Sequence, residues 1–436
     1  MLQSVNDIFS IIAPGGRFAV SLACRITEDG LLFANLGTWF ASRTRWEKAA
    51  LITWGVLLLC VSAYVFASPT TKTVYPIFSA SGRFWWTGTD LYEPHRPTDV
   101  QEGYRYSPTC AILFTPFAIF PDALGGVLWR LFSVGALFGG LFWFARSVLP
   151  IAPSHFAMMT LLIIPLSIQS VGNGQANLVV IACMLGAIAA VNEERWSLAS
   201  ILIAVAFTFK LYPLALGMVL VLLYPRQLSW RIALACLASF AAPFLCQHPA
   251  YVVDQYEKWI AVVGSEDRSD IRLSHMYRDA WLLIYLYGVP ISRKFYLLMQ
   301  VAGGAVVALL CWRRQRASWP TPALLTSTLA LTTAWMMLLG PATESSSFAL
   351  LAPSFAWSIV EALNTKERNA RHGLLWASCV IFAIAVVLGG IVNEWRLHQT
   401  GVHAWASLCY FTYLLLEPRA PAAQESRLAN SPRLAA

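Results

Sequence analysis

The residues that could do chemistry in this chain gather where its long apolar runs are interrupted. Residues 68–108, between the first and second apolar runs, hold eight charged and eight aromatic side chains, although only 12% of the whole chain is charged. Ionisable groups beside a bilayer are costly unless they face water, each other or a ligand. Aromatic side chains among them can anchor a loop at the headgroup level or line a ligand site. We therefore expect chemistry in this segment first.

Four polar residues elsewhere each allow two interpretations. Lys210 interrupts an apolar run, where a cation costs roughly 2.5–3.5 kcal/mol; it either extends to the interface or binds phosphate. Gln175 and Asn177 either cap a helix start or contact substrate. Glu344 follows a breaker at the end of an apolar run, so it is either a helix-dipole partner or a catalytic carboxylate.

Composition identifies the elements that must position these residues. The chain is 57% hydrophobic with a mean hydropathy of +0.58, whereas soluble domains are about 45–50% apolar. Repeated apolar runs of roughly 17–25 residues predict an all-α, polytopic transmembrane protein with about twelve spans. The predicted spans are 49–67, 124–147, 155–170, 176–192, 196–210, 211–225, 230–247, 295–312, 321–340, 345–363, 372–393 and 402–416.

Lysine and arginine positions predict the orientation. Basic residues precede the first span and recur at alternate connections, so the positive-inside rule places both termini in the cytoplasm of a cell inner (plasma) membrane protein. We expect a cytoplasmic segment at 1–48, a transmembrane domain at 49–416 and a disordered tail at 417–436. Two segments stay open. Residues 196–225 form either one broken helix or two spans, and 280–290 either spans or lies in the outer interface.

The same topology places the polar loops on the outer side. The cytoplasmic connections are short and basic and carry no Gly-rich phosphate cradle, so the chemistry should be extracytoplasmic. The nine cysteines lie mostly in apolar runs without paired spacing. We therefore predict no disulfide framework, no metal site and no cofactor. The net charge of +8 indicates anionic membrane lipid rather than nucleic acid as a partner, because the basic residues lie at span ends.

Several short sequence blocks follow one another in a fixed order along the chain. They are Gly-Thr-Asp-Leu-Tyr at 88–92, Tyr-Arg-Tyr-Ser-Pro at 104–108, Thr-Pro-Phe at 115–117 with Pro121, Asn-Gly-Gln-Ala-Asn at 173–177, Phe-Lys-Leu-Tyr-Pro at 209–213 and Gly-Pro at 340–341. Together these blocks resemble glycosyltransferase family 87, whose members are membrane enzymes of the GT-C fold, many of them dependent on polyprenol-phosphate-mannose. The resemblance covers roughly residues 68–360.

The resemblance implies a large first outer loop, a half-inserted helix at about 109–120 and a cavity for a lipid-linked donor. It also implies inverting transfer with one carboxylate as general base. This chain departs from the family at two positions. The Asp that the family commonly has about sixteen residues before Asp-Leu-Tyr is replaced by Val74, and the His after the Ser-Pro block is replaced by the serines at 345–347.

Other carboxylates must therefore be considered as the base, because an inverting displacement needs one within reach of the acceptor hydroxyl. We place Asp90 first, although it could be a turn residue, and Glu344 second. Lys210 and Arg105 fit the departing lipid phosphate. Tyr92 and Tyr106 could stack on sugar faces or anchor the loop in the interface. The remaining candidates for the base are Glu93, Asp99 and Glu102.

Two functions from different classes follow. The first is a hexosyltransferase that moves a sugar, with mannose expected, from a polyprenyl-phosphate donor to an extracytoplasmic glycolipid or glycan acceptor. The alternatives are a transporter or flippase of lipid-linked substrates and a catalytically divergent family member. Transporters tend to place paired charges at mid-membrane in broken helices. Here Lys210 is the main intramembrane charge and the acids lie in outer loops, which favours the enzyme.

Overall fold

The computed structural model describes residues 38–93, 103–265, 273, 276–341, 343–365, 369–391 and 400–417. Every regular element that is bounded within these ranges is a helix, which confirms the all-α prediction. The helices are α3 Arg45–Ala67, α4 Tyr75–Thr87, α5 Pro108–Ala118, α6 Asp122–Val148, α7 Pro153–Leu162, α8 Ile164–Asn173, α9 Asn177–Asn192, α10 Trp196–Phe209, α11 Leu214–Leu223, α12 Pro225–Ala241, η1 Ala242–Leu245, α13 Pro249–Gly264, α14 Ala280–Leu286, α15 Arg293–Arg316, α16 Thr321–Leu339, η3 Ser345–Leu350, α17 Ala352–Asn364, α18 Ala370–Ile391 and α20 Val402–Leu415.

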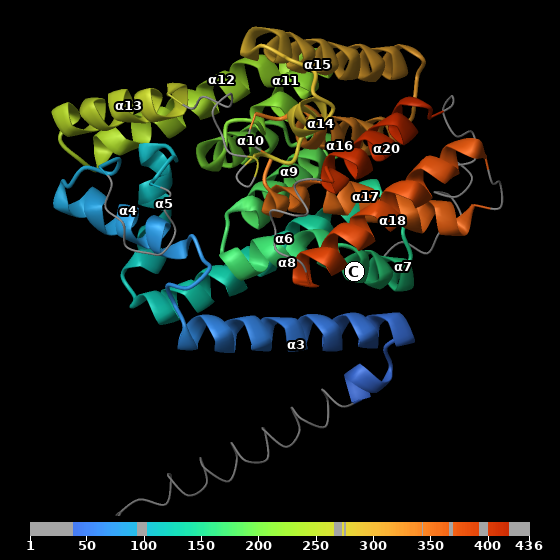
Figure 1. Cartoon of the computed structure of the whole chain (residues 1–436), viewed down its shortest axis with the longest axis horizontal. Helices are drawn as coiled ribbons and strands as arrows, with labels where there is room; N and C mark the ends of the chain where they lie inside the picture. Colours follow the sequence, from blue (N-terminus) through green and yellow to red (C-terminus); the bar gives the residue numbers. More distant parts are fainter. Residues whose placement is uncertain are drawn as a thin grey trace, which may run out of the picture.

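Helix α9 forms the centre of the molecule. Every residue from Asn177 to Val191 is buried, and the helix packs against α6, α10 and α16. A helix that is apolar on all sides must be covered on all sides, which explains why its neighbours enclose it. The first residue of α9, Asn177, is polar and buried, and its side chain donates to Gln175 Oε1 and to the Ser346 carbonyl. Helix α9 lies between α6 and α10 at the middle of the molecule (Figure 1).

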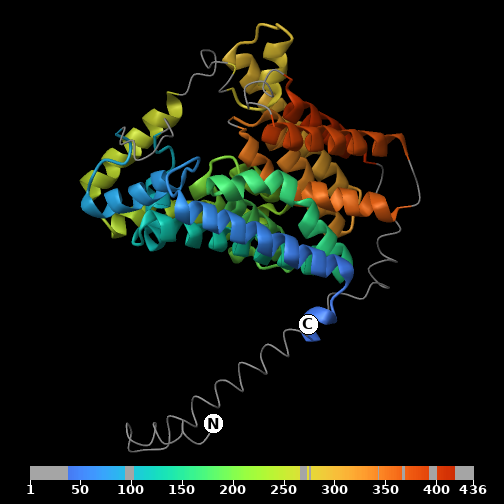
Figure 2. The same cartoon turned by 60° about the horizontal axis from the view of Figure 1, so that its bottom comes forward.

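Helix α3 lies along one outer face of the bundle in both views (Figures 1 and 2). It begins with a capping box: the Thr44 hydroxyl accepts from the Glu47 backbone N–H, and the Glu47 carboxylate accepts from the Thr44 N–H at 2.9 Å. This exchange satisfies two N–H groups that the helix itself cannot pair. The Trp54 indole donates to the Thr160 carbonyl at 2.9 Å and fixes α3 to α7.

Helices α4, α5 and α13 form a subassembly at one end of the molecule (Figures 1 and 2). The rings of Phe78 and Phe114 stack with centroids 4.3 Å apart and join α4 to α5. Gly82 allows the close approach, because a Cβ there would lie 2.9 Å from the Ala118 Cβ. The short helix α5 occupies the place where the family resemblance implies a half-inserted helix at 109–120. Its depth in the membrane stays a prediction.

Six helices of the described ranges are long and apolar enough to cross a membrane, or seven if the bent pair α7–α8 is one span. Four shorter apolar helices, α5, α9, α10 and α11, add to these. The chain is thus a multi-pass membrane protein. The number of about twelve spans is not confirmed. The segments predicted at 1–48 and 417–436 lie mostly outside the described residues.

Two expected spans are interrupted in the structure, and the two segments that the sequence left open are defined by it. The span predicted at 155–170 is two helices, α7 and α8, that meet at 56° beside Pro165, because proline removes a helical hydrogen bond and clashes with the preceding turn. Residues 196–225 form two helices, α10 and α11. Residues 280–290 contain only α14, which at seven residues is too short to span. The predicted span at 345–363 begins with the 3-10 turn η3 before α17.

Candidate active site

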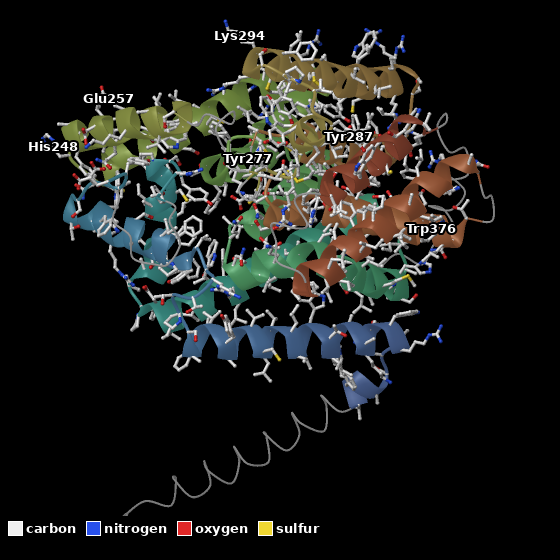
Figure 3. All side chains as sticks on the ribbon, viewed as in Figure 1. His248, Glu257, Tyr277, Tyr287, Lys294 and Trp376 are labelled. Atoms are coloured by element: carbon white, nitrogen blue, oxygen red, sulfur yellow. The ribbon has the colours of Figure 1, made fainter. Side chains whose placement is uncertain are left out.

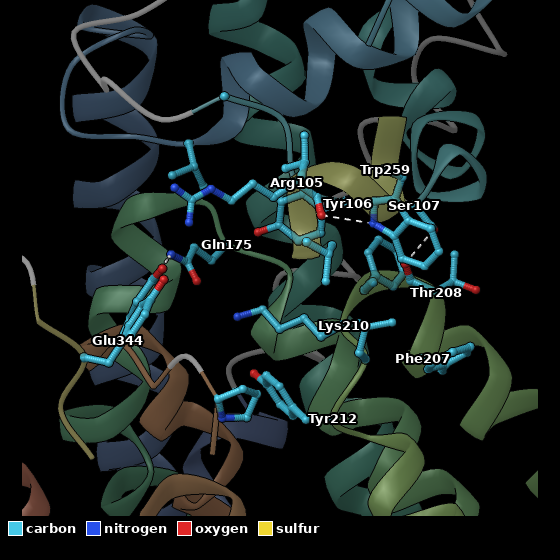
Figure 4. A pocket seen from close by; sticks show the side chains of 18 of the residues that line it. Arg105, Tyr106, Ser107, Gln175, Phe207, Thr208, Lys210, Tyr212, Trp259 and Glu344 are labelled. Carbon is cyan, nitrogen blue, oxygen red and sulfur yellow. Dashed lines mark hydrogen bonds between the residues drawn. The ribbon is translucent and has the colours of Figure 1, made fainter. Parts of the chain in front are cut away.

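A cavity of about 520 Å³ lies where several parts of the chain meet. Its polar side chains Arg105, Gln175, Lys210 and Glu344 point toward a common space (Figure 4). Apolar and aromatic side chains form most of the remaining walls. The parts that line it are the start of α4 with Val74, residues 103–107, Gln175 before α9, the α10–α11 break, the end of α13, Tyr277 with the first turn of α14, the first turns of α15, and Glu344 with Pro341.

The described lining carries an excess of positive charge. Four of its side chains are cationic and one, Glu344, is acidic. Charges of one sign in a cleft with low-dielectric walls concentrate ions of the opposite sign. The cavity is therefore suited to an anionic group, with a single carboxylate left to act as an acid or base. The cations are Arg105, Lys210, Arg293 and Lys294.

Lys210 enters this cavity because α10 ends immediately before it. Pro213 has no N–H to bond the Phe209 carbonyl, and its ring would clash with that carbonyl in a continued helix. Lys210 adopts an extended conformation with φ −149° and ψ 139°. Its ammonium lies 5.5 Å from the centre of the Tyr212 ring. No carboxylate or hydrogen-bond acceptor of the described residues contacts it. An unpaired cation among apolar walls is costly, so a bound anion would stabilise it.

The segment that carries Arg105 is held by aromatic hydrogen-bond donors. Three successive carbonyls, those of residues 105–107, each accept from a different aromatic side chain, so the loop has little freedom to move. The Ser107 hydroxyl in turn donates to the Thr208 carbonyl at 2.9 Å, next to Lys210. The donors are Trp259 Nε1 to Arg105 O at 3.2 Å, Tyr92 Oη to Tyr106 O at 2.7 Å and Tyr104 Oη to Ser107 O at 2.9 Å.

Glu344 is oriented by neutral donors. The Gln175 side-chain amide donates to Glu344 Oε2 at 2.6 Å, and the Ser346 hydroxyl donates to the same oxygen at 3.2 Å. Asn177 Nδ2 donates to Gln175 Oε1 at 2.8 Å and to the Ser346 carbonyl at 2.9 Å. Among the described residues, Glu344 Oε1 has no partner. One carboxylate oxygen is thus fixed and the other is available to a substrate.

The turn before α9 is fixed from α6. Gly174 has φ +70°, a conformation that L side chains rarely adopt, and a Cβ there would lie 3.0 Å from the Arg130 guanidinium. The Trp129 indole donates to the Gly174 carbonyl at 2.7 Å. The buried Arg130 guanidinium donates to the Gly172 carbonyl at 2.7 Å and to Thr73 Oγ1 at 2.9 Å. These contacts place Gln175 at the cavity.

Asp90, the first candidate for the base, lies elsewhere. Its carboxylate accepts from Lys258 Nζ at 2.6 Å and from the Tyr92 backbone N–H at 2.8 Å, and it is not part of the cavity lining. Burial raises the pKa of Asp90, but the Lys258 ammonium and the backbone N–H groups outweigh it and lower the pKa below its ordinary value. Lys258 also pairs with Asp254 at 2.8 Å. Asp90 therefore fastens its loop to α13.

The structure separates the other predicted site residues into two groups. Arg105, Tyr106, Gln175, Lys210 and Glu344 all line the cavity. Tyr92 and Asn177 do not line it and instead hold residues that do, as described above. The alternative bases Asp99 and Glu102 lie outside the described residues.

Comparison with known proteins identifies this arrangement. The sequence pattern of glycosyltransferase family 87 matches residues 104–341, more than half of the chain. The chain belongs to glycosyltransferase family 87. This confirms the resemblance seen in the sequence and the prediction of a membrane glycosyltransferase.

Two curated relatives match over most of their length, and both are named polyprenol-phosphate-mannose-dependent alpha-(1-2)-phosphatidylinositol pentamannoside mannosyltransferase. The protein of Mycobacterium tuberculosis is 25% identical over 354 residues, which cover 79% of this chain and 78% of that protein. The protein of Mycolicibacterium smegmatis is 23% identical, with 74% and 78% covered.

Two solved structures of ArnT from Cupriavidus metallidurans also align with this chain. The apo structure covers 84% of this chain and 77% of ArnT at 15% identity, with a TM-score of 0.38. The structure with undecaprenyl phosphate bound has a TM-score of 0.35 at 16% identity. Similarity this low adds nothing to the assignment, which rests on the family 87 match.

The family 87 position that is expected to hold an Asp does face the cavity. Val74 lines it, its backbone N–H donates to the Asn173 carbonyl at 2.9 Å, and its neighbour Thr73 is held by Arg130. The backbone at this position is thus held by hydrogen bonds beside the cavity, but the valine side chain offers no carboxylate. Glu344 is the one carboxylate of the described lining.

Several polar residues of the lining were not predicted from the sequence, and three of them are instructive. Tyr212 lies within the Lys-Leu-Tyr-Pro block, and its buried hydroxyl has no hydrogen-bond partner among the described residues. Arg293 and Lys294 are not among the predicted site residues, although both line the cavity. Their position at the beginning of a long apolar helix, opposite to the positive-inside preference under the predicted orientation, was the signal that could have identified them.

Proposed function

We propose that this family 87 member transfers a hexose, with mannose as the expected sugar, from a polyprenyl-phosphate donor to a glycolipid or glycan acceptor. One observation carries the proposal: an unpaired Lys210 and an oriented Glu344 face the same cavity. The names of the two curated relatives, both dependent on polyprenol-phosphate-mannose, support this donor.

In the proposed reaction, the leaving group is a lipid phosphate. Lys210 and Arg105 bind its oxygens and stabilise the negative charge that develops as the bond to the sugar breaks. This phosphate needs no proton to depart, since it is a stable anion. The two cations therefore stabilise the leaving group by charge, so that no general acid is needed to protonate it.

Glu344 acts as the general base. The acceptor hydroxyl donates to Glu344 Oε1, its oxygen attacks the anomeric carbon, and its proton passes to Glu344. The bond between the anomeric carbon and the phosphate oxygen breaks, and its electron pair leaves with the phosphate. Attack from the side opposite the phosphate inverts the anomeric configuration. Asp90, whose carboxylate is paired with Lys258, is thus replaced as the proposed base.

Gln175 and Asn177 act through Glu344 as positioning residues, and Tyr106 contributes to the wall against which the sugar lies. The Tyr92 hydroxyl donates a hydrogen bond to the Tyr106 carbonyl and so holds Tyr106 in place.

The distribution of lysine and arginine supports a cavity that opens to the extracytoplasmic side of the inner membrane, with both termini in the cytoplasm. A reporter fused to the C-terminus that is active only in the cytoplasm tests this orientation; activity of a periplasm-dependent reporter would contradict it.

The function is tested with purified protein in lipid nanodiscs, supplied with polyprenyl-phosphate [14C]mannose and a membrane glycolipid extract. We expect release of polyprenyl phosphate and labelling of the glycolipid fraction, and loss of both in Glu344→Gln. The matched control is Glu257→Gln, a carboxylate exposed on α13 away from the cavity (Figure 3). If the donor stays intact while a labelled lipid crosses the bilayer of proteoliposomes, the enzyme assignment is wrong for this chain.

A further inference from the structure

Tyr212 lines the cavity and carries a polar group that the protein does not pair. Its side chain is half-buried, whereas its hydroxyl oxygen is buried and has no hydrogen-bond partner among the described residues. Buried polar groups in proteins are nearly always hydrogen-bonded, so an unpaired one needs a specific explanation. A ligand that supplies the missing acceptor is such an explanation.

The backbone around Tyr212 is fixed by the break between α10 and α11, which comprises residues 210–213. The Lys210 N–H donates to the Ala206 carbonyl at 3.1 Å and so completes the last turn of α10. The Tyr212 carbonyl accepts from the Ala215 N–H at 2.9 Å, in the first turn of α11. Tyr212 is therefore presented to the cavity from the same short, fixed segment as Lys210.

The ring of Tyr212 lies beside the ammonium that is assigned to the donor phosphate. Its centre is 5.5 Å from Lys210 Nζ, within the distance at which an aromatic face attracts a cation. This contact uses the face of the ring and leaves the N–H donors of the ammonium available. In Figure 4 the hydroxyl end of Tyr212 and the ammonium end of Lys210 point to the same side of the break, toward Glu344.

The charge of the cavity decides what kind of partner the hydroxyl meets. A phenol can donate or accept one hydrogen bond. The charged side chains of the described lining are four cations and one carboxylate, so the ligand that this cavity favours is an anion. Toward an anion the hydroxyl is a donor, and hydrogen bonds to ionised acceptors are roughly twice as strong as those between neutral groups.

We propose that the Tyr212 hydroxyl is a third donor to the leaving phosphate, beside Lys210 and Arg105. The inference rests on the proposed function, in which those two cations already bind this phosphate. When the bond between the anomeric carbon and the phosphate oxygen breaks, its electron pair stays with the phosphate, whose negative charge increases. The Tyr212 proton remains on the tyrosine throughout. Its hydrogen bond strengthens as the charge develops, so it increases kcat more than it increases affinity for the donor.

The test compares Tyr212→Phe with a matched control, Tyr251→Phe. Each variant removes one hydroxyl and keeps the ring. Tyr251 lies on α13, does not line the cavity, and donates its hydroxyl to the Thr89 carbonyl at 2.7 Å. Three properties of the purified full chain are measured: the Tm without added lipid substrate, the Kd for polyprenyl phosphate, and kcat and KM with polyprenyl-phosphate mannose.

The two variants should give opposite patterns. In Tyr212→Phe we expect kcat to fall about tenfold and polyprenyl phosphate to bind about tenfold more weakly, while KM for the donor changes less than about threefold. Its Tm should not fall, because the removed hydroxyl has no partner in the described protein. In Tyr251→Phe the Tm should fall, because a hydrogen bond within the protein is lost, while kcat and Kd stay at the wild-type values.

Three results would overturn the proposal. Wild-type kcat and Kd in Tyr212→Phe would mean that the hydroxyl does not contact the phosphate. A lower Tm in this variant would mean that the hydroxyl supports the fold. A higher KM for the acceptor alone would assign the hydroxyl to the acceptor instead. Failure of the proposed function gives a different result, because the wild type itself would then neither consume the donor nor bind polyprenyl phosphate.

Discussion

Two carboxylates of this chain, Asp90 and Glu344, show how surroundings decide the use of a side chain. Asp90 lies on the first loop against α13, where the ammonium of Lys258 neutralises it at 2.6 Å. Glu344 lies in the cavity, where the neutral amide of Gln175 and a serine hydroxyl orient one of its oxygens. A carboxylate engaged by a cation is stabilised as the anion and is a weaker base. Glu344 has no cationic partner among the described residues, and its Oε1 is open to a substrate.

The same contrast applies to the lysines in the two places. Lys258 has two carboxylate partners, and their hydrogen bonds raise its pKa above the ordinary value. Lys210 has no such partner among the described residues and faces the cavity. In the first region the lysine is paired with carboxylates, and its role is structural. The second is unbalanced and suited to an ionic substrate.

The largest expected effect is the loss of kcat in the Glu344→Gln variant. We expect kcat to fall about 10²- to 10⁴-fold, the range that loss of a general base produces, with little change in binding of polyprenyl phosphate. Asp90→Asn should keep kcat within about threefold, because it does not face the cavity. Single-turnover transfer measures both. A large loss of kcat in Asp90→Asn with normal Glu344→Gln activity would reverse the comparison.

The second largest effect is expected for Lys210→Met, which keeps the length and removes the charge. Loss of one group that stabilises transition-state charge costs about 10²- to 10³-fold in kcat. Polyprenyl phosphate binding should weaken as well and lose part of its salt dependence. Lys258→Met is the matched control, since it removes a lysine whose partners are both carboxylates. If Lys258→Met lowers kcat as much as Lys210→Met does, the loss does not come from removing a cation from the cavity, and the role proposed for Lys210 is wrong.

Much of the cavity could be predicted from the sequence because local chemistry defines it. A proline three residues after Lys210 ends α10 there, and Gly-Gln before an apolar run marks a helix start with a polar side chain beside it. These signals require only neighbours in the chain. They indicated Lys210 and Gln175, while Arg105 and Glu344 were added with the help of the family resemblance, and the structure brings all four to one cavity.

The remaining assignments depended on partners far along the chain. Asp90 meets Lys258, 168 positions later, so nothing near Asp90 indicates that it is neutralised. Tyr92 holds the Tyr106 carbonyl rather than lining the cavity, a role that composition cannot distinguish from sugar stacking. The number of spans was uncertain for a related reason: apolar runs such as 155–170 and 345–363 are interrupted by bends and 3-10 turns within the bundle.

A smaller loss of kcat is expected when Glu344 is kept but the residue that orients it, Gln175, is replaced. Gln175→Leu removes the donor to Glu344 Oε2 and should lower kcat about tenfold, the value of one or two hydrogen bonds, while the Kd for polyprenyl phosphate stays constant. Gln300→Leu is the control, because Gln300 lines the same cavity but donates to Leu339. A change in Kd without a change in kcat would mean that Gln175 contacts substrate directly.

The smallest effect concerns stability at the Asp90 cluster. Asp90→Asn should lower the free energy of unfolding by about 1 kcal/mol or less, because Lys258 is partly exposed and solvent screens the pair. The folded-state pKa of Asp90 lies below its ordinary value, so the folded protein binds fewer protons there than the unfolded chain. Its stabilising contribution is complete above the ordinary pKa and is lost as the pH falls through the lowered one.

Thermal unfolding in detergent between pH 7 and pH 3 should therefore show a smaller acid-induced loss of Tm in Asp90→Asn than in the wild type. Glu257→Asn, on the same end of the molecule without a described ion pair, should retain the wild-type slope. If the two variants respond to acid alike, the Asp90–Lys258 pair does not fasten the loop, and Asp90 regains its place as a candidate for catalysis.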